Sequence, residues 1–167
     1  MSKPATPAIA AVQAAGVRHT LHQYAVSLTR EDYGLAVAQA LAVEPGRVFK
    51  TLVAKVDTNL VCAVLPVEHR LDPKALARAA GGRQAALAER GEAERRTGYV
   101  RGGISPLGQR QSLPVFVDAS ALAYETILVS AGKRGLQLEL APLDLVHLAS
   151  ARVAPIVLVQ SHNGRST

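Results

Sequence analysis

Residues 47–65 read RVFKTLVAKVDTNLVCAVL, two apolar runs with a short polar pair between them. The runs, Arg47 to Val56 and Asn59 to Leu65, are rich in the β-branched residues that favour strands. Asp57-Thr58 is a good turn sequence, so the stretch predicts a β-hairpin. The second run is apolar at almost every position, which is typical of a strand buried on both faces. Cys62 within it is expected to be a small core side chain rather than a nucleophile.

Outside the hairpin, helix and strand signals are interspersed along the chain. Helices are predicted where a capping residue precedes a run of helix formers and a glycine or proline ends it. Thr6 is the expected cap of the first helix, and Thr29 and Asp32 resemble a capping arrangement for the second. The predicted helices span 8–15, 33–43, 73–80, 88–96 and 142–150, and further strands span 19–25, 114–118, 126–130, 136–140 and 153–159.

The links between several predicted strands are short enough for hairpins, which favours antiparallel pairing. The sequence therefore predicts a mixed α/β fold: a single compact domain with a mostly antiparallel mixed sheet and helices packed on it, not a doubly wound nucleotide fold. The 167 residues suffice for one well-buried core. The domain is expected to span 1–160, followed by a polar C-terminal tail at 161–167.

The chain is basic, with 19 lysines and arginines against 13 acidic residues and a formal net charge of +6. A positive charge suits a polyanionic partner such as RNA, although many basic proteins bind none. The charge gathers beside glycines rather than on an amphipathic helix, which favours anion-binding loops over a membrane-surface helix. The residues concerned are Arg95, Arg96, Arg101, Arg110, Lys133 and Arg134.

Several patterns that the sequence lacks bear on the cellular location and on cofactors. No apolar run approaches the roughly 20 residues that span a bilayer, and residues 1–7 do not have the pattern of a secretory signal. A cytoplasmic protein with no membrane partner is therefore expected. Cys62 is the only cysteine, so no internal disulfide is expected. His19 and His22 lie on opposite faces of a predicted strand, and no spacing resembles a zinc site, so neither metal nor cofactor is expected.

Lys50 lies in the middle of the first hairpin strand. Alternation places it on one face with Val48, Leu52 and Ala54. An ammonium group among apolar neighbours costs free energy unless it meets a partner or a water-filled cleft. Two interpretations stay open from the residues alone: an edge-strand lysine that discourages aggregation, or a lysine that serves a functional cleft.

Two glycine-rich segments follow. Gly102-Gly103-Ile104-Ser105-Pro106-Leu107-Gly108 predicts a shaped loop whose backbone a substrate can approach. It matches neither a Walker A motif nor a Rossmann fingerprint, and an ordinary connecting turn is the alternative. Ser130-Ala131-Gly132-Lys133-Arg134-Gly135 lies between two predicted strands. It is either a hairpin turn with solvated charges or a backbone nest with two cations for phosphate.

These segments, in this order, resemble the YbaK/EbsC family, whose members are related to the editing domain inserted in bacterial prolyl-tRNA synthetases. The resemblance runs from about Thr6 to Ser150. It rests on the two glycine-rich segments, which together are specific, and on Val48-Phe49-Lys50-Thr51-Leu52 and Thr97-Gly98-Tyr99. It implies a barrel-like mixed sheet surrounded by helices and an aminoacyl-tRNA deacylase activity.

The resemblance also implies roles for single residues. Lys50 corresponds to the family's essential lysine and is the expected catalytic residue, which stabilises negative charge on the terminal phosphate or on the oxyanion of the reaction. The expected substrate-binding residues are Tyr24, Gly102, Gly103, Ile104, Ser105, Pro106, Ser130 and Gly132, and the expected tRNA-binding residues are Arg101, Lys133 and Arg134.

For the closest branch of the family, the resemblance implies removal of cysteine from Cys-tRNA(Pro), and also from Cys-tRNA(Cys), by attack of the substrate's own thiol on its ester. The expected partners are mischarged tRNA and prolyl-tRNA synthetase. Three alternatives stay open: an Ala-tRNA(Pro) or other deacylase, a non-catalytic module that binds tRNA or a synthetase, and a small-molecule anion-binding protein. Gln137 stands where family members often have an aspartate, which leaves the amino acid undecided, and Glu139 on the same strand face is a candidate substitute.

Overall fold

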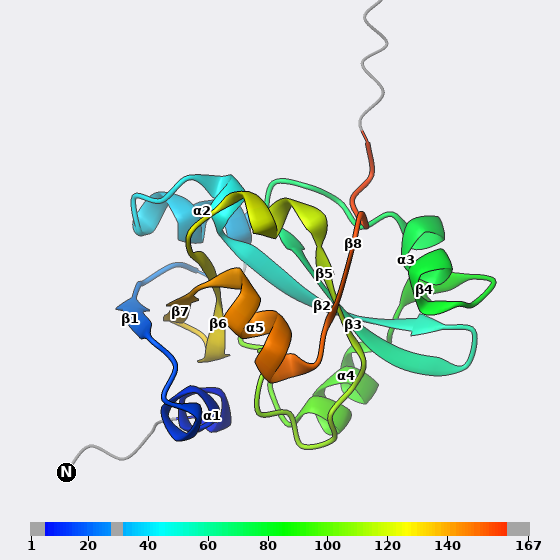
Figure 1. Ribbon diagram of the computed structural model, residues 1–167, viewed down its shortest axis with the longest axis horizontal. Helices are drawn as coiled ribbons and strands as arrows, with labels where there is room; N and C mark the ends of the chain where they lie inside the picture. Colours follow the sequence, from blue (N-terminus) through cyan, green and yellow to red (C-terminus); the bar gives the residue numbers. More distant parts are fainter. Residues whose placement is uncertain (1–5, 28–31, 160–167) are drawn as a thin grey trace, which may run out of the picture.

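The computed structural model describes residues 6–27 and 32–159. Figure 1 shows the helices and strands that these residues form. The helices are α1 (Pro7–Ala15), α2 (Tyr33–Ala40), α3 (Pro73–Ala80), α4 (Arg90–Thr97) and α5 (Pro142–Ala149), with the short 3-10 helices η1 (Pro45–Arg47) and η2 (Ala119–Ala123). The strands are β1 (His19–Gln23), β2 (Phe49–Val56), β3 (Asn59–Pro66), β4 (Ala85–Leu87), β5 (Val115–Asp118), β6 (Ile127–Lys133), β7 (Leu136–Leu140) and β8 (Arg152–Ala154). Among the helices of the described residues, none has the length and apolarity needed to cross a membrane.

The strands form two sheets. The three-stranded sheet has the order β1-β7-β6 and is antiparallel throughout. The five-stranded sheet has the order β4-β2-β3-β5-β8, in which β2 pairs antiparallel with β3 and β4, whereas β5 pairs parallel with β3 and β8. This is the predicted mixed α/β fold with mostly antiparallel pairing. Over the described residues both sheets are open rather than closed into a barrel.

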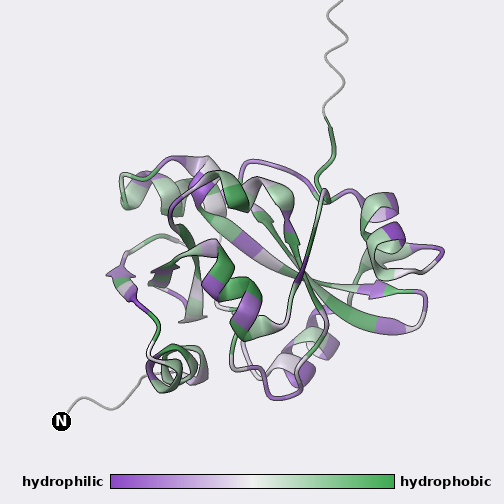
Figure 2. Ribbon diagram, in the orientation of Figure 1, coloured by the Kyte–Doolittle hydropathy of each residue, from purple (hydrophilic) through white to green (hydrophobic). Residues whose placement is uncertain are grey.

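The central core lies between the two sheets. It contains Ile9 of α1, Phe49 of β2 and Leu145 of α5, together with apolar side chains of β3, β5, β6 and β7. The β2–β3 hairpin crosses the middle of the molecule and is coloured mostly hydrophobic in Figure 2. Cys62 on β3 is fully buried within this core, as the sequence predicts.

Two smaller groups of buried side chains cover the outer faces of the sheets. The α3 core joins Leu76 of α3 to the second face of the β2–β3 hairpin and to Phe116. The α2 core joins Val37 of α2 to Val48 and Leu128. Val48 and Leu128 also form an isolated parallel bridge, so β2 and β6 come together at this point.

The local signals that predict α1 and α3 act as expected. The Thr6 hydroxyl oxygen accepts a hydrogen bond from the Ile9 backbone N–H at 3.1 Å, and Gly16 ends α1 in the left-handed region with φ 67°. Asp72 caps α3 by accepting hydrogen bonds from two backbone N–H groups of its first turn. Gly81 ends that helix at φ 76°. The caps explain why the bounds of these two helices are close to the predicted ones.

Elements without such signals differ more from the prediction. The helix predicted over 33–43 ends at Ala40, because the chain turns at Ala42 with φ 55°. Asp32 occupies the cap position without a capping side-chain bond, and Thr29 lies outside the described residues. The strand predicted over 153–159 is shorter, at Arg152–Ala154, and the edge strand β4 was not predicted.

Candidate functional site

Lys50 lies on β2 between the α2 core and the α3 core. Val48 on one side of it belongs to the α2 core, and Leu52 and Ala54 on the other side pack in the α3 core. The predicted face of Lys50 is therefore confirmed. β4 pairs only with residues 54–56, so β4 does not cover the strand edge beside Lys50.

The Lys50 ammonium group has no acidic partner among the described residues. Burial lowers the pKa of Lys50 below the ordinary value of a lysine, and the positive charge of Arg70 lowers it further. A lysine that only protects a strand edge would extend into water and would not be desolvated in this way. The environment therefore favours the cleft interpretation of Lys50, because a ligand can supply the missing negative charge.

Ser130 lies on the strand next to Lys50. The bridge between Val48 and Leu128 aligns β2 with β6, and Lys50 and Ser130 are each two residues beyond it. Residues two apart on a strand point to the same face. Lys50 therefore shares the face of Val48, and Ser130 shares the face of Leu128. This relation was not visible in the sequence, where 79 residues separate them.

Tyr24 and Tyr33 connect the end of β1 to the glycine loop, residues 102–108. The Tyr24 and Tyr33 hydroxyls form a hydrogen bond of 2.9 Å. The Tyr33 hydroxyl also donates to the Gly102 carbonyl at 3.5 Å, which is a long contact. Burial raises the pKa of Tyr33, and its hydrogen bond with Tyr24 raises it further, so Tyr33 is neutral at physiological pH.

The glycine loop packs directly against the β6–β7 turn, residues 133–135. A Cβ at Gly103 would lie 2.9 Å from the Arg134 backbone nitrogen and 3.0 Å from the Lys133 carbonyl carbon. Gly102 has φ 85°, a conformation that other residues rarely adopt. The two glycine-rich segments that the sequence singled out are therefore in contact, and glycine at 103 allows that contact.

The next residues of the glycine loop face inward. Ser105 is fully buried, its hydroxyl oxygen accepts the Leu107 backbone N–H at 3.2 Å, and its carbonyl accepts the Gln109 side-chain amide at 3.0 Å. Pro106 is also buried, and Ile104 packs against the central core. These three predicted site residues hold the shape of the loop, whereas Gly102 and Gly103 face Tyr33 and the β6–β7 turn.

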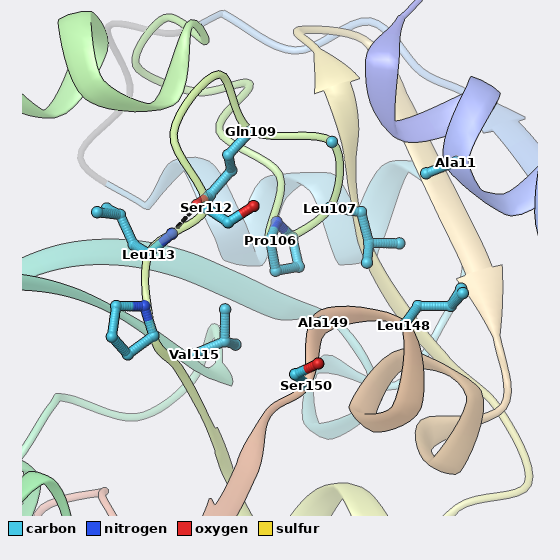
Figure 3. Close-up of a pocket in the computed structure, with 12 residues that line it drawn as sticks. Ala11, Pro106, Leu107, Gln109, Ser112, Leu113, Val115, Leu148, Ala149 and Ser150 are labelled. Carbon is cyan, nitrogen blue, oxygen red and sulfur yellow. Dashed lines mark hydrogen bonds between the residues drawn. The ribbon is translucent and has the colours of Figure 1, made fainter.

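A cavity of about 360 Å³ lies on the other side of the glycine loop, toward α1 and α5 (Figure 3). Pro106, Leu107 and Gly108 form one wall, and the C-terminal end of α5 forms another. Neither Lys50 nor Tyr33 lines this cavity. It is therefore separate from the group of residues around Lys50.

Ser130 and Gln137 face each other on β6 and β7 and are both buried, with exposed fractions of 8% and 6%. The Ser130 hydroxyl oxygen accepts the Gly132 backbone N–H at 3.1 Å. Gly132 lies in a bulge of β6 with φ 98°, where a side chain would collide with the Tyr99 ring. The Gln137 side-chain oxygen is a buried acceptor with no hydrogen-bond partner among the described residues.

The three predicted tRNA-binding cations gather where the glycine loop meets the β6–β7 turn. Arg101, Lys133 and Arg134 are all exposed. The Arg134 Nε donates a hydrogen bond of 2.8 Å to the Arg101 carbonyl, so one of these cations also contacts the loop backbone. Their positive charge therefore lies close to Gly102 and Gly103.

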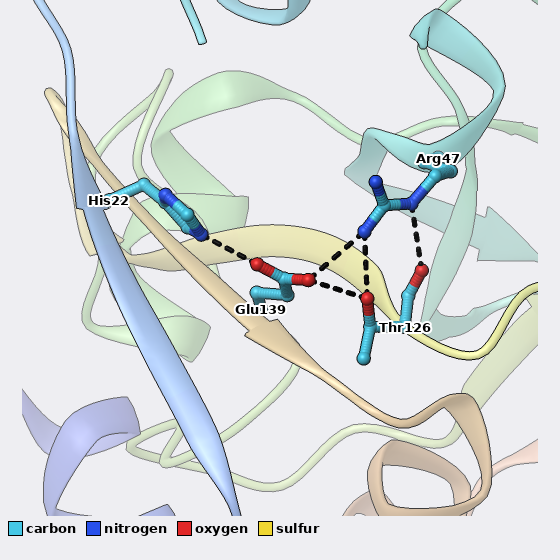
Figure 4. A network of polar contacts seen from close by, with 4 residues as sticks. All are labelled: His22, Arg47, Thr126 and Glu139. Carbon is cyan, nitrogen blue, oxygen red and sulfur yellow. Dashed lines mark hydrogen bonds and ion pairs between the residues drawn. The ribbon is translucent and has the colours of Figure 1, made fainter. Parts of the chain in front are cut away.

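Glu139 of β7 connects β1, η1 and the residue before β6 (Figure 4). Its Oε1 accepts from His22 at 2.7 Å, and its Oε2 accepts from Arg47 at 3.0 Å and from the Thr126 hydroxyl at 2.5 Å. These contacts, first the bond from Thr126 and then those with His22 and Arg47, hold the pKa of Glu139 below its usual value. Both carboxylate oxygens are engaged, so Glu139 acts as a structural anchor, and its substitution for the family's aspartate stays a prediction.

Sequence reasoning missed Tyr33 and the anchoring role of Glu139. The available signal for Tyr33 was that tyrosine is a rare residue type in this chain, which has four. Glu139 gave no signal, because its partners are distant in sequence. Over residues 6–27 and 32–159, no group of three histidine, cysteine or acidic side chains is arranged to hold a metal ion.

Comparison with known proteins places the chain in a family. Residues 34–148 match the model of the aminoacyl-tRNA editing domain, and this span includes Lys50, the glycine loop and the β6–β7 turn. The chain therefore belongs to the aminoacyl-tRNA editing domain family. The family match makes the class of this protein an aminoacyl-tRNA editing enzyme.

A relative and two solved structures sharpen this assignment. A protein of Enterococcus faecalis, named "Putative Cys-tRNA(Pro)/Cys-tRNA(Cys) deacylase EbsC", is 43% identical over 122 residues, which are 72% of this chain and 74% of that protein. A crystal structure of "a putative trans-editing enzyme for prolyl tRNA synthetase" has a TM-score of 0.80 at 24% identity and covers 95% of this chain and 99% of its own. The hypothetical protein APE2540 has a TM-score of 0.80 at 23% identity and covers 92% and 100%. The two structures confirm the predicted fold, and the relative confirms the predicted family.

Proposed function

We propose that the chain is a trans-editing aminoacyl-tRNA deacylase that removes cysteine from Cys-tRNA(Pro), and also from Cys-tRNA(Cys). The name of the Enterococcus faecalis relative supports this substrate. The observation that carries the proposal is Lys50, a partly buried cation with a lowered pKa and no acidic partner among the described residues. The 3′ end of a charged tRNA brings the negative charge that this cation lacks.

Lys50 is the catalytic residue of the proposed reaction. Its ammonium group stabilises the negative charge that develops on the ester carbonyl oxygen, or the charge of the terminal phosphate. A preorganised cation in a site that excludes water contributes on the order of 10²-fold or more to a rate. The lowered pKa of Lys50 marks a desolvated site, in which such a charge acts more strongly than in water.

The amino acid is held beside the glycine loop. The groups proposed to contact it are the Gly102 and Gly103 backbone, the Tyr24 and Tyr33 hydroxyls, Ser130 and the Gly132 backbone. Ile104, Ser105 and Pro106 contribute by fixing the loop.

The proposed chemistry needs no nucleophile from the protein. The substrate's sulfur attacks the carbonyl carbon of its own ester, so a carbon–sulfur bond forms and the carbon–oxygen bond to the ribose breaks. The thiol proton passes to the ribose oxygen through water, and the products are cysteine thiolactone and free tRNA. Discrimination then comes from the thiol itself, which is useful because binding pockets separate small side chains weakly.

The tRNA lies across the exposed cations. Arg101, Lys133 and Arg134 flank the glycine loop and neutralise phosphates near the charged end. Prolyl-tRNA synthetase is the proposed protein partner, since it would supply selectivity for the tRNA. Charged tRNA is present in the cytoplasm, which is the proposed location.

A panel of substrates tests this proposal. The purified protein is incubated with Cys-tRNA(Pro), Ser-tRNA(Pro) and Ala-tRNA(Pro), and the release of each amino acid and of thiolactone is followed. Cysteine is expected to leave at least ten times faster than serine, whose hydroxyl is a much weaker nucleophile. Equal rates for cysteine and serine would overturn the thiol mechanism, release of alanine alone would overturn the substrate, and no release at all would overturn the deacylase.

A further inference from the structure

The peptide units on both sides of Arg101 are held by side chains of opposite charge. The Arg101 backbone N–H donates to the Glu94 Oε2 at 2.8 Å, and the Arg101 carbonyl accepts from the Arg134 Nε at 2.8 Å. Glu94 belongs to α4, and Arg134 belongs to the β6–β7 turn. Two elements far apart in sequence therefore grip the residue that directly precedes Gly102.

Both bonds have an ionised partner, which makes them shorter and stronger than bonds between neutral groups. The bond from the Arg101 backbone lowers the pKa of Glu94, and the charges of Arg90 and Arg134 lower it further. Glu94 is therefore ionised at neutral pH. It also accepts from the Arg90 Nε at 3.3 Å, which fixes the carboxylate on α4.

The two hydrogen bonds to the Arg101 backbone also affect the position of the glycine loop. The Gly103 backbone N–H donates to the Val100 carbonyl at 2.9 Å, so residues 100–103 form a tight turn with Arg101 inside it. Gly102 presents its carbonyl to Tyr33, and Gly103 lies against the backbone of Arg134. Displacement of Arg101 would move these two glycines together with it.

We propose that Glu94 and Arg134 are positioning residues that hold the Gly102–Gly103 backbone where the amino acid binds. The inference rests on the proposed deacylase function. Neither residue needs to touch the reacting atoms, because each acts through the Arg101 backbone. Arg134 thus serves the loop through its Nε in addition to facing the tRNA.

Two substitutions that change the net charge in opposite directions distinguish a positioning role from simple electrostatic attraction of tRNA. Glu94→Ala adds one positive charge to the surface, and Arg134→Gln removes one. If these residues acted only through attraction, Glu94→Ala would bind tRNA more tightly and would not slow the reaction. Positioning instead predicts that both variants lower kcat for Cys-tRNA(Pro), by about 10-fold each, because each loses a bond to a charged group that holds the loop.

Matched variants and a double variant complete the kinetic test. Glu92→Ala makes the same charge change on the same helix but releases only Lys55, and it is expected to keep kcat within about twofold. Glu94→Gln retains an acceptor for the Arg101 N–H, so it is expected to lose less than Glu94→Ala. The double variant Glu94→Ala/Arg134→Gln is expected to lose clearly less than the product of the single losses, because both act on one backbone segment.

Hydrogen exchange at the Arg101 and Gly103 amides gives a readout that does not depend on activity. Glu94→Ala and Arg134→Gln are expected to speed exchange at these amides and to leave the amides of β2 and β3 unchanged. Wild-type kcat and unchanged exchange in Glu94→Ala would overturn the positioning role. If the wild-type protein released no amino acid, the proposed function would fail, and the exchange rates would still decide whether Glu94 and Arg134 hold the loop.

Discussion

The two ends of β2 carry one lysine each, and the two lysines have opposite surroundings. Lys55 lies where β4 covers the strand, its side chain is 43% exposed, and its Nζ is 3.3 Å from the Glu92 Oε1. Lys50 lies where β4 does not reach, has no acidic partner among the described residues, and shares its neighbourhood with Arg70. The same residue type on one strand therefore satisfies its charge at one end and leaves it unsatisfied at the other.

This difference identifies a position at which the fold is less stable than it could be. A desolvated lysine next to another cation weakens the fold, because neither burial nor the neighbour favours its charge. The Lys55 end follows the ordinary rules of a solvated, paired side chain. The Lys50 end breaks those rules next to the strand that carries Ser130, as expected of a site that a charged ligand completes.

The largest expected effect of a glycine substitution separates Gly103 in the glycine loop from Gly82 at the Lys55 end of β2. Gly103→Ala places a Cβ 2.9 Å from the Arg134 backbone nitrogen and forces the glycine loop off the β6–β7 turn. We expect deacylation of Cys-tRNA(Pro) to fall about 10²-fold, because a small displacement of a binding loop is enough for such a loss. Single-turnover release of cysteine measures it.

Gly82→Ala is the matched control at the Lys55 end. Its Cβ would meet Val56 Cγ1 at 2.4 Å and Asp57 Oδ2 at 2.9 Å. We expect a lower melting temperature and an unchanged rate per folded molecule. If Gly82→Ala slowed the reaction as much as Gly103→Ala, the functional difference between the two ends would disappear.

A smaller effect is expected on the anchor that fixes the start of β2. Glu139→Gln keeps the shape of the side chain but removes the charge that holds His22 and Arg47. We expect unfolding in urea at pH 7 to require about 1 kcal/mol less free energy, a value reduced for the partial exposure of these groups.

The pH dependence of the Glu139→Gln effect has a definite sign. The pKa of Glu139 is lowered in the folded state, so its contribution is complete above the unfolded value of about 4.3 and is lost as the pH falls through the folded value. The difference between wild type and variant should therefore shrink in acid. A difference that stayed constant down to pH 3 would show that charge is not what anchors β2.

The smallest expected effect compares the two lysines directly by stability. Lys50→Met should leave the free energy of unfolding unchanged or raise it by up to about 1 kcal/mol at pH 7, because it removes an unpaired cation. The folded pKa of Lys50 lies below the unfolded one, so this gain should shrink as the pH rises through the folded pKa and should be gone above the unfolded value of about 10.4. Lys55→Met should lower stability by about 0.5 kcal/mol or less, and less still in high salt. A Lys50→Met variant clearly less stable than wild type would show that Lys50 is a structural residue.

Much of the fold was predictable because its signals are local. The hairpin around Asp57, the capped helices α1 and α3, and the burial of Cys62 follow from alternation, capping and apolar runs. β4 and the end of α2 were not predictable in this way. β4 is a three-residue strand that exists through its pairing with β2, and α2 ends without a glycine or proline stop signal at its last turn.

The candidate site was predictable in its parts but not in its connections. Alternation gave the face of Lys50, and the glycines of both segments marked unusual backbone. The contact between Gly103 and the β6–β7 turn, the Tyr33 hydroxyl and the Glu94 bond to Arg101 all depend on tertiary packing, for which a single sequence holds no local signal.

Deacylation of Cys-tRNA(Pro) by wild type and by Lys50→Ala under single-turnover conditions tests the central claim most directly, with Lys55→Ala as the control on the same strand. We predict that wild type and Lys55→Ala release cysteine at similar rates and that Lys50→Ala is slower by about 10²-fold or more. Circular dichroism confirms that all three proteins are folded. Cysteine release by folded Lys50→Ala at the wild-type rate would contradict the account.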